Sequence, residues 1–495
     1  MKVLQMKKVV LLLFCFWMLS VNAQHSFEFT FGTNEDELLL SAVEDYNNNV
    51  ILVGRIGNRG TVDFDPLVIK VSPNGTYISK RIIREDTNGF FKTINLLHDS
   101  TYLITGMYSN SIGFGYDNLW ICKMDTNLNV VFEKSYNLIE GSIYTGMATV
   151  YSLIDNENNI VVSGSKSYEQ FTDMLLIKLN QEGDTLFTRT HHFQFGQRIT
   201  NITCIPGSND YLGITGIIGI ANNNYGPIRF DSVFNILNIK HFYFSTGIQN
   251  KGTSDHWLND TTYMHSCLSI KDHERRIMVY NIDTAMRFHK SLELDKPDTS
   301  DYPAWRTSMA YANDSTIYIG GFTHILEFYP TDPNAVEVYV IDTGLNLLGY
   351  KEFGWDANYD VWGMVETSDD GCLLYGNRRT EENTTESDVH IIKVLREDFD
   401  ITTTIKETNI NNIYSKAWPN PASNKLFIKL FDMDAAYLDL RIFNLSGREM
   451  TRRRVFGDGN VLEINVQPLS PGTYIYHISS GDGQIISDKF IKTNY

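Results

Sequence analysis

The chain has 495 residues and a formal net charge of −17 at pH 7. This charge excludes electrostatic attraction to nucleic acid or to an anionic membrane surface, and it indicates a soluble protein that resists non-specific adhesion. A chain of this length can bury a large core, so its fold does not depend on disulfide staples.

The N-terminus has the three parts of a secretory signal peptide. Lysines near the start supply positive charge, residues 9–19 are apolar, and Val21-Asn22-Ala23 offers small residues for cleavage. The apolar run is shorter than the roughly twenty residues that a membrane-spanning helix needs. We therefore expect a signal peptide at residues 1–23 and a mature chain that begins near Gln24 without a transmembrane segment. An uncleaved anchor is the alternative.

Short apolar runs, each ending in a small residue, recur along the chain at intervals of about fifty residues, a period typical of propellers and solenoids. The seven runs end at Gly54, Gly106, Gly164, Gly216, Ser266, Gly320 and Gly376. Turns rich in Asn, Asp, Ser and Gly precede most of them. These residue types suit hairpins because they tolerate left-handed backbone conformations or bond to their own backbone.

Each unit continues with an alternating strand that often ends in Ile-Lys, then a second turn and a mixed strand. Examples of the Ile-Lys strand are Asp65–Lys70, Asp173–Lys178 and Asp388–Lys393. With the strand that approaches the apolar run, each unit has four strands, the size of one propeller blade. We predict an all-β fold with little helix, in which residues 24–400 form a seven-bladed β-propeller.

The last repeat suggests how the ring closes. The seventh unit ends near Asp398 without an obvious fourth strand, and the mature N-terminus, Ser26–Gly32, has the sequence of such a strand. We expect residues near Phe29 to pair with the strand near Ile391, because this pairing would cover exposed sheet edges. An open solenoid is the alternative, since it shares the repeat size.

The repeats resemble a known family. Phe31–Asp36 and Phe353–Asp356 each lead into an apolar run or its hairpin, and with the Ile-Lys strands they look like the secreted bacterial β-propeller repeats found upstream of type IX sorting tails. The likeness covers roughly residues 25–400. It is weak in units four and five, where the Lys is missing. The resemblance implies a fold and no common reaction.

No local catalytic motif is present in the sequence: it lacks a complete nucleophile elbow, a zinc-protease helix, a phosphate loop and a dinucleotide fingerprint. Asp155–Asn159 has oxygen ligands at alternate positions, as in a calcium loop, but the required Gly and Glu are missing further on, which favours a structural turn. His191 and His192 are neighbours on a strand and should point to opposite faces. We predict no catalytic residue, cofactor or metal site.

Units four and five depart most from the repeat and are rich in histidine: His241, His256, His265 and His273. A broken repeat can mark a functional loop, but drift in a non-critical blade gives the same pattern and is the favoured interpretation. Most of the many aromatic residues alternate along strands and should pack between blades.

The mature chain has four cysteines, which occur singly within apolar runs: Cys122, Cys204, Cys267 and Cys372. We expect them to act as small buried hydrophobes. Two disulfides are the alternative in an exported protein.

After a polar linker at residues 401–412, residues 413–495 alternate in short runs that predict a small Ig-like β-sandwich. Its motifs resemble the type A C-terminal sorting domain of the type IX secretion system. The matching positions are Pro419, Asn420, Pro421, Gly447, Gly472, Tyr474, Lys489 and Lys492. The resemblance implies that these residues carry the sorting role as a unit.

The resemblance also implies recognition by the type IX secretion machinery, followed by release or attachment at the outer-membrane surface. For the propeller we expect a non-catalytic binding or adhesion module for a glycan or a protein. The alternative is a polysaccharide hydrolase or lyase whose carboxylates meet only in the fold. Two acids about 5–10 Å apart at the channel mouth, one with a raised pKa, would favour the enzyme, and an aromatic platform without such a pair would favour the binder.

Overall fold

The computed structural model describes two compact units of the chain, residues 1–401 and 402–495. Residues 26–399 and 414–493 are described, with gaps at 58–63, 84–87, 110–117, 138–146, 169–170, 194–196, 218–224, 241–246, 272–273, 295–299, 324–332, 381–386, 432–436, 446, 457–460 and 481–484. Within these ranges no helix combines the length and the hydropathy needed to cross a bilayer.

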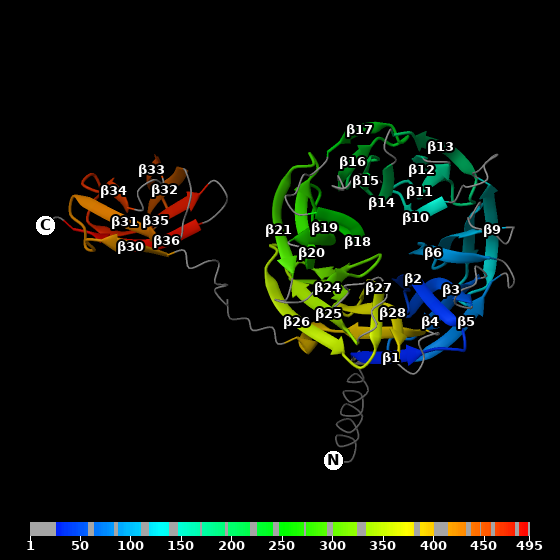
Figure 1. Ribbon diagram of the computed structural model, residues 1–495. Coiled ribbons are helices and arrows are strands. Elements are labelled where there is room, and N and C mark those ends of the chain that lie inside the picture. Colours follow the sequence, from blue (N-terminus) through cyan, green and yellow to red (C-terminus); the bar gives the residue numbers. More distant parts are fainter. Residues whose placement is uncertain are drawn as a thin grey trace, which may run out of the picture. The chain divides into compact units, whose positions relative to one another are not determined.

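The first unit is a ring of seven antiparallel sheets, the blades (Figure 1). Blade 1 has β2 (Asp36–Glu44), β3 (Val50–Gly57), β4 (Phe64–Val71) and β5 (Tyr77–Ile82). Blade 2 has β6 (Gly89–Leu96), β7 (Tyr102–Tyr108), β8 (Asn118–Met124) and β9 (Val130–Asn137). Blade 3 has β10 (Met147–Ile154), β11 (Ile160–Tyr168), β12 (Phe171–Leu179) and β13 (Thr185–His191). Blade 4 has β14 (Gln197–Cys204), β15 (Tyr211–Ile217), β16 (Tyr225–Phe230) and β17 (Ile236–Ile239).

The remaining blades follow the same order, from the inner strand to the outer one. Blade 5 has β18 (Gly247–Trp257), β19 (Thr262–Lys271), β20 (Glu274–Asp283) and β21 (Phe288–Leu294). Blade 6 has a divided inner strand, β22 (Tyr302–Pro303) and β23 (Met309–Asn313), then β24 (Thr316–Phe322), β25 (Ala335–Ile341) and β26 (Leu347–Gly354). Blade 7 has β27 (Asn358–Thr367), β28 (Gly371–Arg379), β29 (Asp388–Val394) and β1 (Phe27–Phe31), with a short 3₁₀ turn after β29, η1 (Arg396–Asp398).

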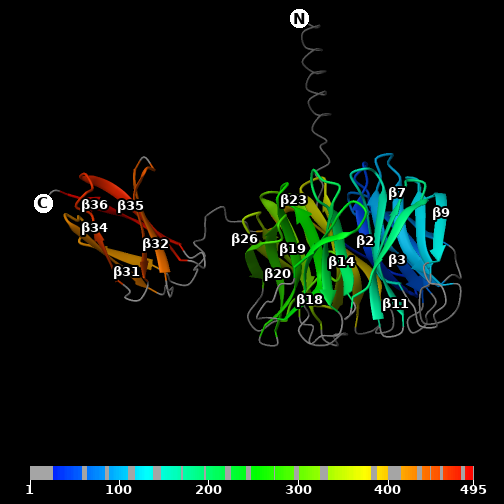
Figure 2. The same cartoon turned by 90° about the horizontal axis from the view of Figure 1, so that it is seen from above.

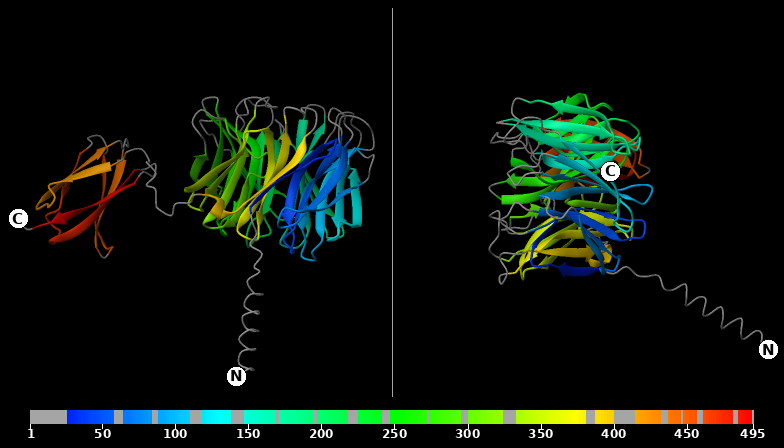
Figure 3. Two further views of the ribbon diagram at one scale, coloured as in Figure 1. Left: turned by 90° about the horizontal axis from the view of Figure 1, so that it is seen from below. Right: turned by 90° about the vertical axis from the view of Figure 1, so that its right-hand side faces the viewer.

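The N-terminal strand completes the last blade. β1 pairs antiparallel with β29, and Phe29 lies opposite Ile391, the pairing that the sequence predicted. The first unit is therefore a closed seven-bladed propeller rather than an open solenoid (Figure 1). Seen edge-on, the strands run between the two faces of the ring (Figure 2, Figure 3).

The hydrophobic core lies between neighbouring blades. Ile51 and Val53 of blade 1 share a buried cluster with Ile104 and Trp120 of blade 2, and similar clusters join the other blades. The second and third strands are covered on both faces, which explains their continuous apolar runs. The outer strand β9 instead alternates between half-buried and exposed residues, as a half-covered sheet edge requires.

Several hairpin turns share one backbone geometry. Asp45 Oδ1 accepts hydrogen bonds from the backbone N–H groups of Asn47 and Asn49, and Asn48 between them has a positive φ of 63°. In the turns between the third and outer strands of blades 2, 4, 5 and 6 an apolar residue takes this left-handed position, with φ between 56° and 65°: Leu128, Phe234, Met286 and Leu345. All of these apolar side chains are buried, so each pins its turn to the core.

The second unit is the predicted small β-sandwich. One sheet has β30 (Tyr414–Trp418), β31 (Lys425–Phe431) and β34 (Val461–Asn465). The other has β33 (Glu449–Phe456), β32 (Tyr437–Asn444), β35 (Gly472–Ser480) and β36 (Ile485–Lys492). Leu426, Ile428, Leu440 and Tyr476 belong to its core. Arg452, Arg453 and Arg454 are exposed on the edge strand β33.

Candidate functional site

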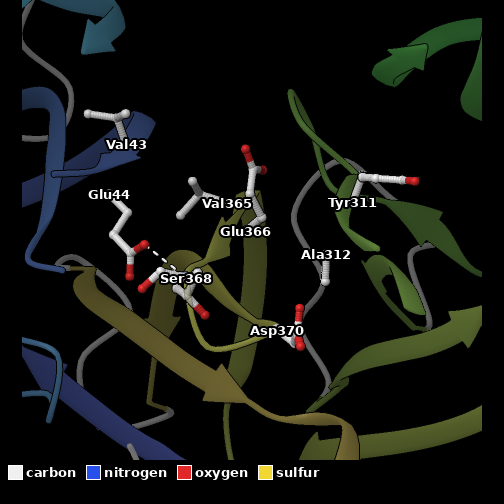
Figure 4. A pocket seen from close by; sticks show the side chains of 9 residues that line it. Val43, Glu44, Tyr311, Ala312, Val365, Glu366, Ser368 and Asp370 are labelled. Carbon is white, nitrogen blue, oxygen red and sulfur yellow. Dashed lines mark hydrogen bonds between the residues drawn. The ribbon is translucent and has the colours of Figure 1, made fainter. Parts of the chain in front are cut away.

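A pocket of about 320 Å³ opens where the inner strands of blades 6, 7 and 1 end (Figure 4). The three inner strands end on the same face of the ring, so their last residues form the walls of the pocket. The lining residues are Val43, Glu44, Tyr311, Ala312, Val365, Glu366, Thr367, Ser368 and Asp370. We call this site the strand-end pocket. It combines apolar walls with carboxylates, a phenol and hydroxyl groups.

Glu44 joins blade 1 to blade 7 at the pocket wall. Its Oε2 accepts a hydrogen bond of 2.7 Å from the backbone N–H of Ser368. Burial raises the pKa of the Glu44 carboxyl, and the hydrogen bond from Ser368 only partly offsets this effect. Part of its hydrogen-bonding capacity is therefore committed to holding the two blades together.

Glu366 is the acid that faces the open space. Its side chain is exposed, but protein surrounds it on most sides, and the reduced solvation raises the pKa of its carboxyl. Figure 4 shows this carboxyl pointing away from Glu44, whose own carboxyl turns toward Ser368. The pocket thus brings acids together without aiming them at a common point.

Tyr311 forms the wall on the blade 6 side. Its ring stacks on His256 of blade 5 with a centroid separation of 3.8 Å and an interplanar angle of 12°, and its hydroxyl donates to Asp314. Desolvation lowers the pKa of His256, which keeps the imidazole neutral at pH 7. One face of Tyr311 is therefore covered, and the ring is held in a fixed orientation.

The Ile-Lys strands of the repeat have a structural role. Each Lys forms an ion pair with an Asp in the first hairpin turn of its own blade, at 2.7–3.2 Å: Lys70–Asp45, Lys123–Asp99, Lys178–Asp155 and Lys393–Asp369. In blade 4, where the Lys is missing, Arg229 pairs with Asp210 at 2.7 Å. The pair thus survives in one of the two divergent blades.

Asp155 shows why its turn is structural rather than a calcium loop. Its Oδ1 accepts the backbone N–H groups of Glu157 and Asn159, and its Oδ2 contacts Lys178 Nζ at 2.8 Å and the Tyr211 hydroxyl at 2.9 Å. Burial acts to raise the pKa of this carboxyl, but Lys178 and the hydrogen bonds outweigh it and hold the pKa below its usual range. Both oxygens are occupied by the protein itself.

The histidines point to separate partners. His191 Nε2 lies 2.8 Å from the carbonyl oxygen of Phe234, while His192 Nδ1 lies 2.6 Å from Asp173 Oδ1. His265 is fully buried against Asp255. Two further histidines from the sequence analysis, at 241 and 273, lie outside the described residues.

No group of three or more His, Cys, Asp or Glu side chains in the described part of the chain could hold a metal ion. The four cysteines are free, and three of them are buried: Cys122, Cys267 and Cys372.

In the second unit, the predicted sorting residues meet at one end of the sandwich. Gly472 lies opposite Lys492, and Tyr474 lies between Phe490 and Asn444 on the flanking strands. Tyr474 stacks on Phe490 at 5.6 Å and donates from its hydroxyl to Ser470 O.

The two remaining motifs reach the same end. Asn420, between Pro419 and Pro421, accepts the backbone N–H of Ile491 at 2.9 Å. Gly447 closes the turn after Asn444 in a left-handed conformation, with φ of 79°. Lys489 is exposed and Lys492 is buried. Four motifs that are far apart in the sequence thus lie at one end of the sandwich.

The fold and these sites define an exported β-propeller protein with a C-terminal address domain. Residues 416–493 match the family described as the secretion system C-terminal sorting domain. The second unit is the type IX sorting domain, and the protein is a type IX cargo that is secreted or held at the cell surface.

No curated protein matches the sequence. Among solved structures, a protein of unknown function from Dyadobacter fermentans is 10% identical with a TM-score of 0.44, covering 74% of this chain and 98% of its own. Polysaccharide lyase Uly1 is 8% identical with a TM-score of 0.43, covering 71% and 88%. An α-L-arabinanase of Penicillium chrysogenum is 10% identical with a TM-score of 0.39, covering 62% and 93%. Similarities of this size carry no function over to the chain.

Proposed function

We propose that the protein is an exported binding module whose propeller holds a glycan in the strand-end pocket. The observation that carries the proposal is the pocket itself, which offers hydrogen-bond acceptors and donors between apolar walls where three inner strands end. A volume of about 320 Å³ is at the lower end of the range for ligand sites. It suits a sugar residue, which presents hydroxyl groups on an otherwise apolar ring.

The arrangement of the acids favours binding over catalysis. Hydrolysis by paired carboxylates requires the two groups to flank one bond. Glu44 instead bonds to the backbone of Ser368, and Glu366 points away from it (Figure 4). Carboxylates in these positions accept hydrogen bonds from ligand hydroxyls without an opposed partner.

A polysaccharide-active enzyme is the second candidate. The observation in its favour is that Glu44 and Glu366 both have a raised pKa in one pocket. A carboxyl with a raised pKa can stay protonated closer to neutral pH and donate a proton to a leaving group. Glu366 would be the general acid because its carboxyl faces the open space.

A thermal-shift titration with neutral soluble polysaccharides and their oligosaccharides tests the binding proposal. A ligand at a hundred times its Kd should stabilise the mature chain by about 2.7 kcal/mol. Glu366→Gln should weaken that response, while Asp184→Asn, at an exposed ion pair on blade 3, should leave it unchanged. If no polysaccharide in the panel changed the unfolding temperature, both the glycan-binding and the polysaccharide-active hypotheses would be contradicted, and a protein partner would be favoured.

Product analysis separates the binder from the enzyme. Glycan fragments released by the wild type and not by Glu366→Gln would establish catalysis. Saturable binding without fragments would support the binding module.

We further propose that residues 1–23 are removed on export and that the clustered sorting residues act as one recognition unit. Intact-mass measurement of the exported protein tests the first point, because cleavage predicts an N-terminus at Gln24. Secretion assays on variants of Asn420 and Tyr474 test the second. If each variant were exported as well as the wild type while remaining folded, the clustered residues would not be the recognition element.

A further inference from the structure

Arg306 occupies an unusual place in blade 6, between the two short pieces of the divided inner strand. The segment from Trp305 to Thr307 runs along the inner strand of blade 7. Trp305 N donates to Val361 O at 2.9 Å, and Arg306 N donates to Trp362 O at 3.0 Å. Thr307 then forms an isolated parallel bridge with Gly363. These bonds fix the backbone of Arg306 at the wall of the central channel.

The Arg306 side chain crosses that channel. Its Nη2 lies 3.3 Å from the carbonyl oxygen of Val150, and its guanidinium lies 5.0 Å from the ring centroid of Tyr151. Both residues belong to β10, the inner strand of blade 3. Blades 3 and 6 stand on opposite sides of the ring (Figure 1), so contact between their inner strands runs through its centre.

Among the described residues, Arg306 has no counter-ion. The residue is only 8% exposed, and across the described residues no carboxylate pairs with it. A guanidinium has five N–H donors, and one long hydrogen bond to Val150 together with the ring of Tyr151 satisfies few of them. Buried cations elsewhere in this ring have acids: Lys178 pairs with Asp155, and Lys393 with Asp369. A buried charge without a partner is costly, and the repeat avoids it at its other positions.

A second unsatisfied donor lies beside it. The indole Nε1 of Trp362 is buried and has no hydrogen-bond partner within the described ranges. Trp362 is the residue whose carbonyl oxygen receives the backbone N–H of Arg306. Trp362, whose side-chain donor lacks a partner, is thus held against Arg306 through a backbone hydrogen bond.

We propose that the channel at Arg306 is a binding site for a carboxylate-bearing small ligand, such as a uronic acid residue. The planar fork of a guanidinium matches the two oxygens of a carboxylate, and such pairs form strong bidentate hydrogen bonds. Tyr151 would cover one side of the ligand.

This site differs from the strand-end pocket in position and charge. Glu44, Glu366 and Asp370 give that pocket a negative field, which repels a carboxylate. The two sites therefore select different ligands, and the channel site does not rest on the proposed function of the pocket.

Isothermal titration of the mature full-length chain with sodium glucuronate tests the proposal, with glucose and sodium sulfate as comparison ligands at equal ionic strength. We expect saturable binding of one glucuronate per chain that depends on Arg306, whereas any binding of glucose should be the same in the wild type and in Arg306→Gln. Arg306→Gln should weaken binding by roughly tenfold or more, because it removes both the charge and the fork. Arg306→Lys should fall between the two, since it keeps the charge alone. Arg287→Gln, whose side chain is 71% exposed, is the matched control and should bind like the wild type.

The wild-type titration decides the matter even if an Arg306 variant does not fold. Absence of glucuronate binding would overturn the proposal and leave Arg306 as a structural brace across the ring. Equal binding by folded Arg306→Gln would also overturn it. Binding of sulfate in preference to glucuronate would contradict the carboxylate specificity.

Discussion

Replacing Lys178 with Met should destabilise the propeller more than the loss of an exposed ion pair would. The Nζ atom of Lys178 lies 2.8 Å from Asp155, and the two side chains are only 5% and 4% exposed. The substitution keeps the length of the side chain and removes its charge, so it leaves Asp155 as an uncompensated buried carboxylate. Breaking a buried pair in this way typically costs 3–5 kcal/mol.

The contacts that remain set the expected value within that range. Asp155 keeps the hydroxyl of Tyr211 and the backbone N–H groups of Glu157 and Asn159. These bonds continue to stabilise the carboxylate, so we expect a loss of about 3 kcal/mol. Guanidinium unfolding followed by Trp fluorescence measures this loss as a lower midpoint with an unchanged slope.

Two controls make the test specific. Lys134→Met breaks the exposed Lys134–Asp184 pair, which is 2.6 Å long, and should leave the midpoint unchanged. Combining Lys178→Met with Asp155→Asn should recover part of the loss, because no buried charge then remains. Equal effects of Lys178→Met and Lys134→Met would refute the reasoning, since burial would then have no influence on the cost.

Three further outcomes follow from the structure. Phe234→Gly should destabilise the propeller by about 2 kcal/mol or more. Glycine removes the backbone strain of the left-handed φ of 64°, but the loss of a buried side chain outweighs this gain. Asn48→Gly should be nearly neutral in the same unfolding assay. Burial of His390 lowers its pKa to about 4. As the pH falls, the unfolded state therefore binds a proton before the folded state does. Between about pH 6.5 and 4 the free energy of unfolding of the wild type should fall by up to roughly 3 kcal/mol, and His390→Asn should not show this loss. Asn420→Ala removes the acceptor for Ile491 N and should cost the sandwich about 1 kcal/mol, measured as a lower unfolding temperature of its own transition.

The repeat and its closure could be predicted because their signals are local. Apolar runs, hairpin turns and the alternation of the N-terminal segment lie within short stretches, and the pairing of Phe29 with Ile391 followed from matching two of them. The Ile-Lys pattern was visible, but its purpose was not. Lys178 pairs with an Asp in another turn of its blade, and Tyr211 of the next blade completes the contact.

The candidate sites were not predictable in the same way. Glu44 and Ser368 meet across 324 positions of sequence, and only ring closure brings them together. Arg306 contacts Val150 over 156 positions and through the centre of the ring. The buried apolar residues at left-handed turn positions had a signal, since Asp-Thr or Asp-Ser precedes each of them at a fixed spacing, as in Asp125–Asn129. The left-handed conformation alone favours Gly or Asn at this position. The burial of the side chain therefore outweighs the local backbone preference.

Because β1 completes the last blade, the ring can close only after nearly the whole propeller has been synthesised. β1 is synthesised first, and its partner strand β29 is synthesised only much later, because Thr30 and His390 are 360 positions apart. Until β29 is made, β1 has no strand to pair with, and its unpaired backbone groups can pair with other chains. A product that stops before residue 388 keeps such an edge permanently and becomes a target for aggregation or proteolysis. Only a chain long enough to include β29 can therefore form the closed ring.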